Sequence, residues 1–180
     1  MAAGGRAPCH PEVMARLLIV HHSPSRHVEA LTQAVVDGAG DDAIEGVEVV
    51  ARPALEATAQ EVLAADGIVL GTSANFGYMS GALKHFFDST FLQIGGGLDA
   101  DGGAGGGGAA ESGGTIPWGL YVHGRYDTTG AVRAVESIVG ALPWRRAAPV
   151  LEVLGDVGTQ EQEAGYELGA TLAALISTGG

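Results

Sequence analysis

The sequence contains little cysteine, little positive charge and few aromatic residues. A single cysteine, Cys9, in 180 residues excludes an internal disulfide and is typical of a protein from a reducing compartment. Only 9 lysines and arginines stand against 21 aspartates and glutamates, which gives a formal net charge of -12. This charge disfavours nucleic acids and anionic membranes as partners, because both would be repelled by most of the surface.

Long apolar runs are also missing. No stretch approaches the length of a transmembrane helix, and the residues before Arg16 lack the apolar core of a signal peptide. We therefore expect a cytoplasmic protein. Residues 1–15 are rich in alanine, glycine and proline and predict a flexible tail, which leaves a single domain over residues 16–177.

Within that domain, short apolar runs of strand type alternate with amphipathic helical patterns. The predicted strands cover residues 17–20, 47–50, 67–70, 116–122 and 147–154, and each is followed by a helical pattern. Pro149 indicates an edge position for the last strand, because proline cannot donate a ladder hydrogen bond. The predicted helix starts are Ser80 and Asp127 as N-caps, and two capping-box pairs, Thr58 with Glu61 and Thr159 with Gln162.

Five strand–helix units predict a parallel sheet with helices on both faces, most often in the strand order 2-1-3-4-5. In that order the switch point lies between strands 1 and 3, and ligands bind beyond the carboxyl ends of the strands there. The polar loops after Val20, Leu70 and Val122 are therefore expected to be neighbours. Residues 95–114 are dominated by glycine and predict a disordered connection.

Residues 71–88, GTSANFGYMSGALKHFFD, carry the most detailed motif: small polar residues after a strand, an aromatic residue and glycine, then a helix. This stretch resembles the strand-3 loop of the flavodoxin-like family, most closely in its NAD(P)H-dependent FMN reductase and quinone reductase branch. The resemblance implies a three-layer flavodoxin-like fold with a five-stranded parallel sheet of order 2-1-3-4-5. It also implies bound FMN, with NADH or NADPH as electron donor.

The same resemblance implies which residues contact the cofactor. Ser23 and Ser25 stand where the family places hydroxyls around the FMN phosphate, whereas Arg26 replaces a glycine and His27 and Val28 replace a polar pair. Phe76 or Tyr126 would stack on the flavin ring. The implied cofactor-binding residues are Ser23, Ser25, Arg26, His27, Val28, Thr72, Ser73, Ala74, Asn75, Phe76, Gly77, His123, Gly124, Arg125, Tyr126 and Asp127.

Other chemistries find less support. Histidines 21, 22, 27 and 123 are expected at one end of the sheet, but their spacing matches no metal motif, so no metal is predicted. A nucleophile elbow needs G-x-S-x-G, which the sequence around Ser80 does not provide. Strand 3 ends without a phospho-acceptor aspartate. No G-x-G-x-x-G motif follows strand 1, and a Walker A motif is absent from the sequence.

The expected function is an FMN-dependent oxidoreductase that transfers electrons from NAD(P)H to a quinone or a similar small-molecule acceptor. His123 or Tyr126 would donate protons to that acceptor. By the resemblance, a homo-dimer or homo-tetramer is expected. Two alternatives stay open: a flavodoxin-type electron carrier that docks a redox partner, and a flavodoxin-like module that has lost its cofactor.

Overall fold

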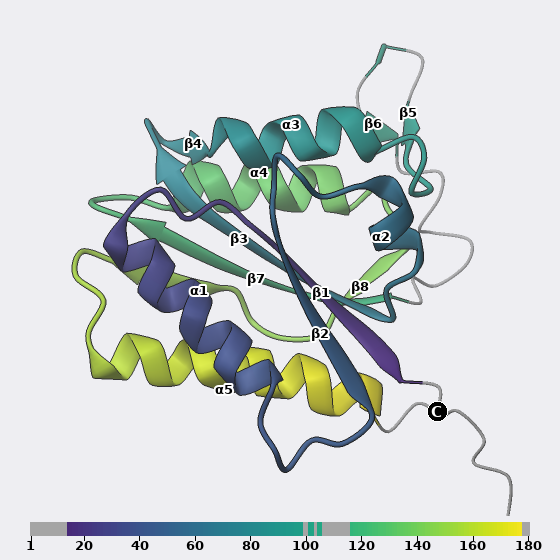
Figure 1. The fold of residues 1–180 in the computed structure, drawn as a ribbon. Coiled ribbons are helices and arrows are strands. Elements are labelled where there is room, and N and C mark those ends of the chain that lie inside the picture. Colours follow the sequence, from purple (N-terminus) through teal and green to yellow (C-terminus); the bar gives the residue numbers. More distant parts are fainter. Residues whose placement is uncertain (1–13, 99–100, 103, 106–115, 178–180) are drawn as a thin grey trace, which may run out of the picture.

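A computed structural model describes residues 14–98, 101–102, 104–105 and 116–177 of the chain. It has three layers, with a central sheet covered by α1 and α5 on one face and by α3 and α4 on the other (Figure 1). The main strands are β1 (Ala15–His21), β2 (Val47–Pro53), β3 (Gly67–Asn75), β7 (Ile116–Gly124), β8 (Trp144–Arg146) and β9 (Leu151–Leu154). Residues 1–13 of the predicted tail lie outside the described residues.

The sheet order is β2-β1-β3-β7-β8. Strand β9 also pairs with β7, at residues 121–124, after the part of β7 that pairs with β8. All these pairings are parallel. The predicted order 2-1-3-4-5 is thus confirmed. Of the last predicted strand, residues 147–154, only residues 151–154 form a strand, β9, and β8 lies just before the predicted start. Pro149 lies between β8 and β9, where its missing N–H interrupts no ladder.

Helices connect the strands as the sequence predicts. They are α1 (Arg26–Ala39), α2 (Ala59–Leu63), α3 (Gly81–Thr90), α4 (Thr129–Val139) and α5 (Thr159–Ser177). None of the helices within the described ranges is long and apolar enough to cross a membrane. Part of the predicted glycine-rich connection forms a short antiparallel pair, β5 (Gly97–Leu98) with β6 (Ala104–Gly105), and residues 99–100, 103 and 106–114 of the connection lie outside the described ranges.

The predicted helix caps hold at two of four positions. Ser80 accepts a hydrogen bond from the Leu83 N–H, and Thr58 and Glu61 form the complete capping box. Asp127 is displaced by one residue, since Thr128 occupies the N-cap of α4. The predicted pair Thr159–Gln162 is wrong: α5 already includes Thr159, and Glu161 instead accepts the Gly158 N–H.

Strands β3 and β7 are longer than the sequence predicts. Residues 72–75 belong to β3, and His123 and Gly124 belong to β7, although both segments were expected to be loops. Hydrogen-bonding partners explain the difference: β7 pairs with β3 as far as Ser73, and the short strand β4 (Tyr78–Met79) pairs with its end. Small polar residues have low strand preference, and these neighbours override it.

Side chains alternate between two apolar cores, one on each face of the sheet. On β3, for example, Leu70 packs with the α3 and α4 layer, whereas Val69 packs with the α1 and α5 layer. Helices α1 and α5 contact each other at glycines. A Cβ atom at Gly169 would lie 1.9 Å from the Val35 carbonyl oxygen, and one at Gly38 would lie 2.0 Å from the Tyr166 carbonyl oxygen.

This close contact predicts that Gly169→Ala destabilises the fold, although alanine ordinarily favours a helix. The added methyl group would meet backbone atoms that cannot rotate away, so we expect a loss of about 1–3 kcal/mol in the free energy of unfolding. Gly81→Ala is the matched control, because that helical glycine faces open space. Urea denaturation measures both variants, and equal effects of the two would contradict the packing described.

Candidate functional site

A tight hairpin follows β3 at the edge where β1, β3, β7 and β9 end, which we call the carboxyl edge. Its turn is Phe76–Gly77, and both residues have positive φ values, 52° and 76°. A glycine adopts this backbone freely, whereas a phenylalanine is strained in it. The turn holds the Phe76 side chain away from the protein, so that it is fully exposed to solvent.

A second exposed aromatic residue lies on the neighbouring loop, between β7 and α4. Tyr126 is 88% exposed. The start of α4, directly after this loop, adjoins the hairpin closely, because a Cβ atom at Gly130 would lie 1.9 Å from the Gly77 carbonyl oxygen. Two large aromatic side chains without a packing partner of their own thus extend from adjoining loops. Such exposure is costly in water and is typical of a surface that takes up an apolar or aromatic ligand.

The two hydroxyl residues at the end of β3 have different surroundings. The Thr72 hydroxyl is engaged: it accepts the Ser80 N–H at 3.0 Å and donates to the Ser73 carbonyl oxygen at 2.9 Å. The Ser73 side chain is 7% exposed, and its Oγ has no hydrogen-bond partner among the described residues. A buried hydroxyl without a partner costs about 1–3 kcal/mol, so Ser73 is a position where a ligand would recover lost hydrogen bonding.

The start of α1 lies across from Ser73 at the same edge. The Ser25 side chain caps α1 by accepting the Val28 N–H, although at a long 3.5 Å. Within the described residues the backbone N–H groups of Arg26 and His27 have no acceptor. Free N–H groups at a helix start attract anions, and the helix dipole adds to the attraction.

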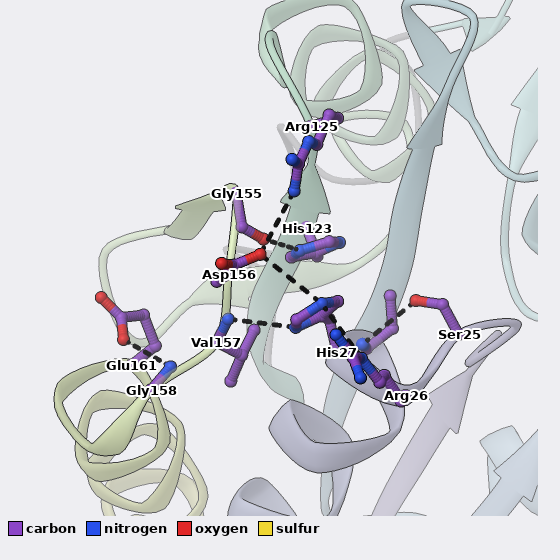
Figure 2. Close-up of polar contacts among 11 residues, drawn as sticks. Ser25, Arg26, His27, His123, Arg125, Gly155, Asp156, Val157, Gly158 and Glu161 are labelled. Atoms are coloured by element: carbon purple, nitrogen blue, oxygen red, sulfur yellow. Dashed lines mark hydrogen bonds and ion pairs between the residues drawn. The ribbon is translucent and has the colours of Figure 1, made fainter.

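Beside this helix start, His27 and His123 form a stacked pair (Figure 2). Their ring centroids are 5.7 Å apart and their planes differ by 13°. The Val157 N–H donates to His27 Nδ1 at 3.2 Å, and His123 Nε2 donates to the Gly155 carbonyl oxygen at 2.7 Å. Both rings therefore hold the loop between β9 and α5, and the His27 side chain is not directed at a phosphate.

Charged residues of that loop complete the cluster. Asp156 lies 3.6 Å from His27 Nε2 and 3.2 Å from Arg125 Nη1. Arg125 and Asp156 have side chains that are mostly exposed, so their ion pair contributes only about 0–1 kcal/mol to stability. Asp127, which the sequence predicts as a helix cap and as a cofactor contact, accepts the Thr129 N–H and hydroxyl at the start of α4, and these hydrogen bonds lower the pKa of its carboxyl group.

A chain of hydrogen bonds runs beneath the loop that follows β1. His21 Nδ1 lies 2.9 Å from Ser23 Oγ, Ser23 Oγ lies 2.7 Å from Thr32 Oγ1, and Thr32 Oγ1 lies 2.6 Å from the Tyr121 hydroxyl. Gly71 makes room for the last of these groups, because a Cβ atom there would lie 2.1 Å from the phenol oxygen. The Ser23 hydroxyl thus points inward.

Sequence reasoning missed part of this arrangement. The sequence predicts Thr32 only as part of a helix and Tyr121 only as part of a strand. The predicted site does not include the loop at Asp156. The fifth strand ends at the same edge as the others, so its polar Gly155–Val157 loop could have been included from topology alone. The single threonine on the otherwise apolar face of α1 was the available signal for Thr32.

A cavity of about 540 Å³ elsewhere in the molecule offers an alternative ligand site between α1 and α5. Asp37, Glu163 and Glu167 are among its lining residues, and no cation lines it. An anionic ligand would be repelled there. No group of three or more metal-ligating side chains was found in the described part of the chain. The carboxyl edge is therefore the better candidate for a phosphate-bearing ligand.

Comparison with solved structures identifies the architecture. A flavodoxin from the domain Archaea superposes with a TM-score of 0.65 and 15% identity, covering 89% of this chain and 98% of its own. A flavodoxin, WrbA-like protein from Agrobacterium tumefaciens superposes with a TM-score of 0.66 and 14% identity, covering 91% of this chain and 98% of its own. The chain has the flavodoxin-like fold.

Sequence comparison agrees with this flavodoxin-like fold over part of the chain. A flavodoxin from Aquifex aeolicus is 31% identical over 86 residues, which are 48% of this chain and 45% of the relative. The match thus spans about half the length of that relative. No protein-family model matches the chain.

The partly buried position of His21 predicts a pH dependence of stability. Burial, followed by the nearby His22, lowers the pKa of His21 below its ordinary value of 6.5. Below about pH 6.5 the unfolded chain therefore binds a proton at His21 more readily than the native state does. The free energy of unfolding should fall as the pH decreases below about 6.5, and this group should not affect it at higher pH. His21→Gln should reduce that decrease.

Urea denaturation at several pH values between 7.5 and 5 would measure the effect. His85→Gln is the control, because His85 is exposed on α3. An unchanged slope in the His21 variant would contradict the assignment of this histidine as a partly buried neutral group.

Proposed function

We propose that the chain is an FMN-dependent oxidoreductase that takes electrons from NADH or NADPH and delivers them to a quinone or a similar small acceptor. The observation that carries the proposal is the pair of exposed aromatic residues, Phe76 and Tyr126, on adjoining loops next to the unpartnered Ser73 hydroxyl and the free start of α1. One flat ring with a phosphate-bearing chain would use all of these groups.

The residues at the carboxyl edge fit FMN. Phe76 and Tyr126 would flank the ring, the Ser73 hydroxyl would bond the ring edge or the ribityl chain, and the N–H groups of Arg26 and His27 would hold the phosphate. The unpartnered Nδ1 atom of His22 is a further buried polar group near this site. The Ser23 and Thr72 hydroxyls do not take part, since both already have partners within the protein.

When bound, the flavin would supply the hydride and electron transfer, which no side chain of this site can perform. The protein's share is positioning and proton supply. His123 is oriented by its hydrogen bond to Gly155, so in its neutral form the other ring nitrogen, Nδ1, is free to accept a proton. Tyr126 is exposed on the loop that follows β7 and can offer a donor hydroxyl to a bound acceptor.

Assembly and partners are part of the same proposal. We propose a homo-dimer or homo-tetramer and a small-molecule electron acceptor, with no nucleic acid or membrane as partner. The net charge of -12 supports the absence of polyanionic partners.

The same charge favours a second candidate function. A flavodoxin-type electron carrier would use an acidic surface to dock a basic redox partner, and the sequence match is to a flavodoxin. Steady-state oxidation of NADH or NADPH in the presence of a soluble quinone separates the two candidates. The proposed oxidoreductase turns over with one of the nicotinamides, whereas a carrier alone shows almost no oxidation of either.

Truncation of the two exposed aromatic residues tests the flavin site. We expect Phe76→Ala and Tyr126→Ala each to weaken FMN binding by about two- to tenfold, because stacking on an aromatic ring contributes about 0.5–1.5 kcal/mol. Quenching of FMN fluorescence measures the affinity. Tyr166→Ala is the control, since Tyr166 is an exposed tyrosine on α5, away from the carboxyl edge.

Failure of the wild-type protein to quench FMN fluorescence at high protein concentration would reject both flavin functions. It would leave the third possibility, a flavodoxin-like module without a cofactor. Equal losses in the control and the two edge variants would place the flavin elsewhere on the molecule.

A further inference from the structure

The hydrogen-bond chain beneath the β1–α1 loop has one consistent direction. Tyr121 is completely buried, and burial raises the pKa of its hydroxyl, which therefore stays protonated and needs an acceptor. The Thr32 hydroxyl lies closest to it, at 2.6 Å. We assign donation from Tyr121 to Thr32, from Thr32 to Ser23, and from Ser23 to the Nδ1 atom of neutral His21.

The opposite direction would give the buried phenol a poorer acceptor. If His21 donated into the chain, each hydroxyl would pass its hydrogen onward to Tyr121, and the phenol hydrogen could turn only to Ser23 Oγ, which would already accept from His21. The lowered pKa of His21 agrees with the assigned direction, because Nδ1 can accept only when the ring is neutral.

The assigned direction determines what the loop can offer to a ligand. The Ser23 hydrogen is used within the protein, so this hydroxyl cannot donate to an anion. The inward side chain also anchors the loop at its middle, between the end of β1 and the Ser25 cap. The backbone N–H groups at the start of α1 remain as donors, together with the Ser25 hydroxyl, and the direction of these N–H groups depends on the shape of the anchored loop.

We propose that Thr32 and Tyr121 are positioning residues for a phosphate group: their hydroxyls hold Ser23 inward and so fix the loop 22–25 with the first N–H groups of α1 facing outward. Neither residue touches the ligand. The inference rests on the proposed function for the identity of the phosphate, which is that of FMN, but the anchoring of the loop is a property of the protein alone.

Two substitutions remove the hydroxyls with little change of shape. Thr32→Val and Tyr121→Phe should weaken FMN binding by roughly tenfold while changing riboflavin binding less than about twofold, because riboflavin has no phosphate for the loop to hold. Thr32→Ser retains the hydroxyl and should preserve the preference for FMN. Flavin fluorescence quenching gives both affinities for every variant.

A purely structural role would have a different signature. Thr90→Val is the matched control, because Thr90 is also a buried threonine, bonded to the Phe86 carbonyl oxygen in the opposite layer. It should lower stability without changing the ratio of FMN to riboflavin affinity. If Thr32→Val and Tyr121→Phe also leave that ratio unchanged, the proposal is overturned even though FMN binds.

Hydrogen exchange on the flavin-free protein tests the anchoring of the loop even if no flavin binds. The hydrogen-bonded amides at the two ends of the loop, those of His22, Val28 and Glu29, should exchange roughly tenfold faster in Tyr121→Phe than in the wild type, because the loop loses its anchor. Amides of the β3–β4 hairpin should exchange at the wild-type rate. Unchanged exchange at His22, Val28 and Glu29 would refute the positioning role, whereas a failure to bind FMN alone refutes only the proposed function.

Discussion

The pairing of β3 with β1 on one side and β7 on the other is the constraint on which the site depends. Because all three strands are parallel, their following segments meet at one edge of the sheet. The register is specific as well: Ser73 lies opposite His123, and Gly71 lies opposite both His21 and Tyr121. Residues far apart in sequence are thereby brought within hydrogen-bonding distance, and no single loop would suffice to build the site.

Alternation along β3 then gives each residue a separate task. Thr72 faces the α3 layer and ties β3 to the start of that helix, whereas Ser73 faces the α1 layer and keeps an unused hydroxyl. Gly71 leaves the space that the Tyr121 hydroxyl occupies. The stability of the edge therefore comes from groups that already have partners, and the groups without partners, Ser73 and the start of α1, are left for a ligand.

Much of the fold follows from the sequence, because apolar runs and helix caps alternate regularly from Arg16 onward. The order of the strands, the neighbouring loops and the cap at Ser80 were all predictable. The extent of β3 was not, because its last residues are ordered by hydrogen bonds from β4 and β7 rather than by their own preference. Nor could a sequence reveal that the Ser23 hydroxyl turns inward, since that depends on a tyrosine 98 positions away.

Mapping of FMN binding by amide chemical shifts tests the central claim, that the carboxyl edge is a flavin site, most directly. FMN added to isotope-labelled protein should shift the amides of Arg26, His27 and Ser73, together with those of the Phe76 and Tyr126 loops. Amides that line the cavity between α1 and α5, such as those of Gln33 and Gln162, should stay unchanged. Shifts confined to that cavity, or none at saturating FMN, would contradict the account.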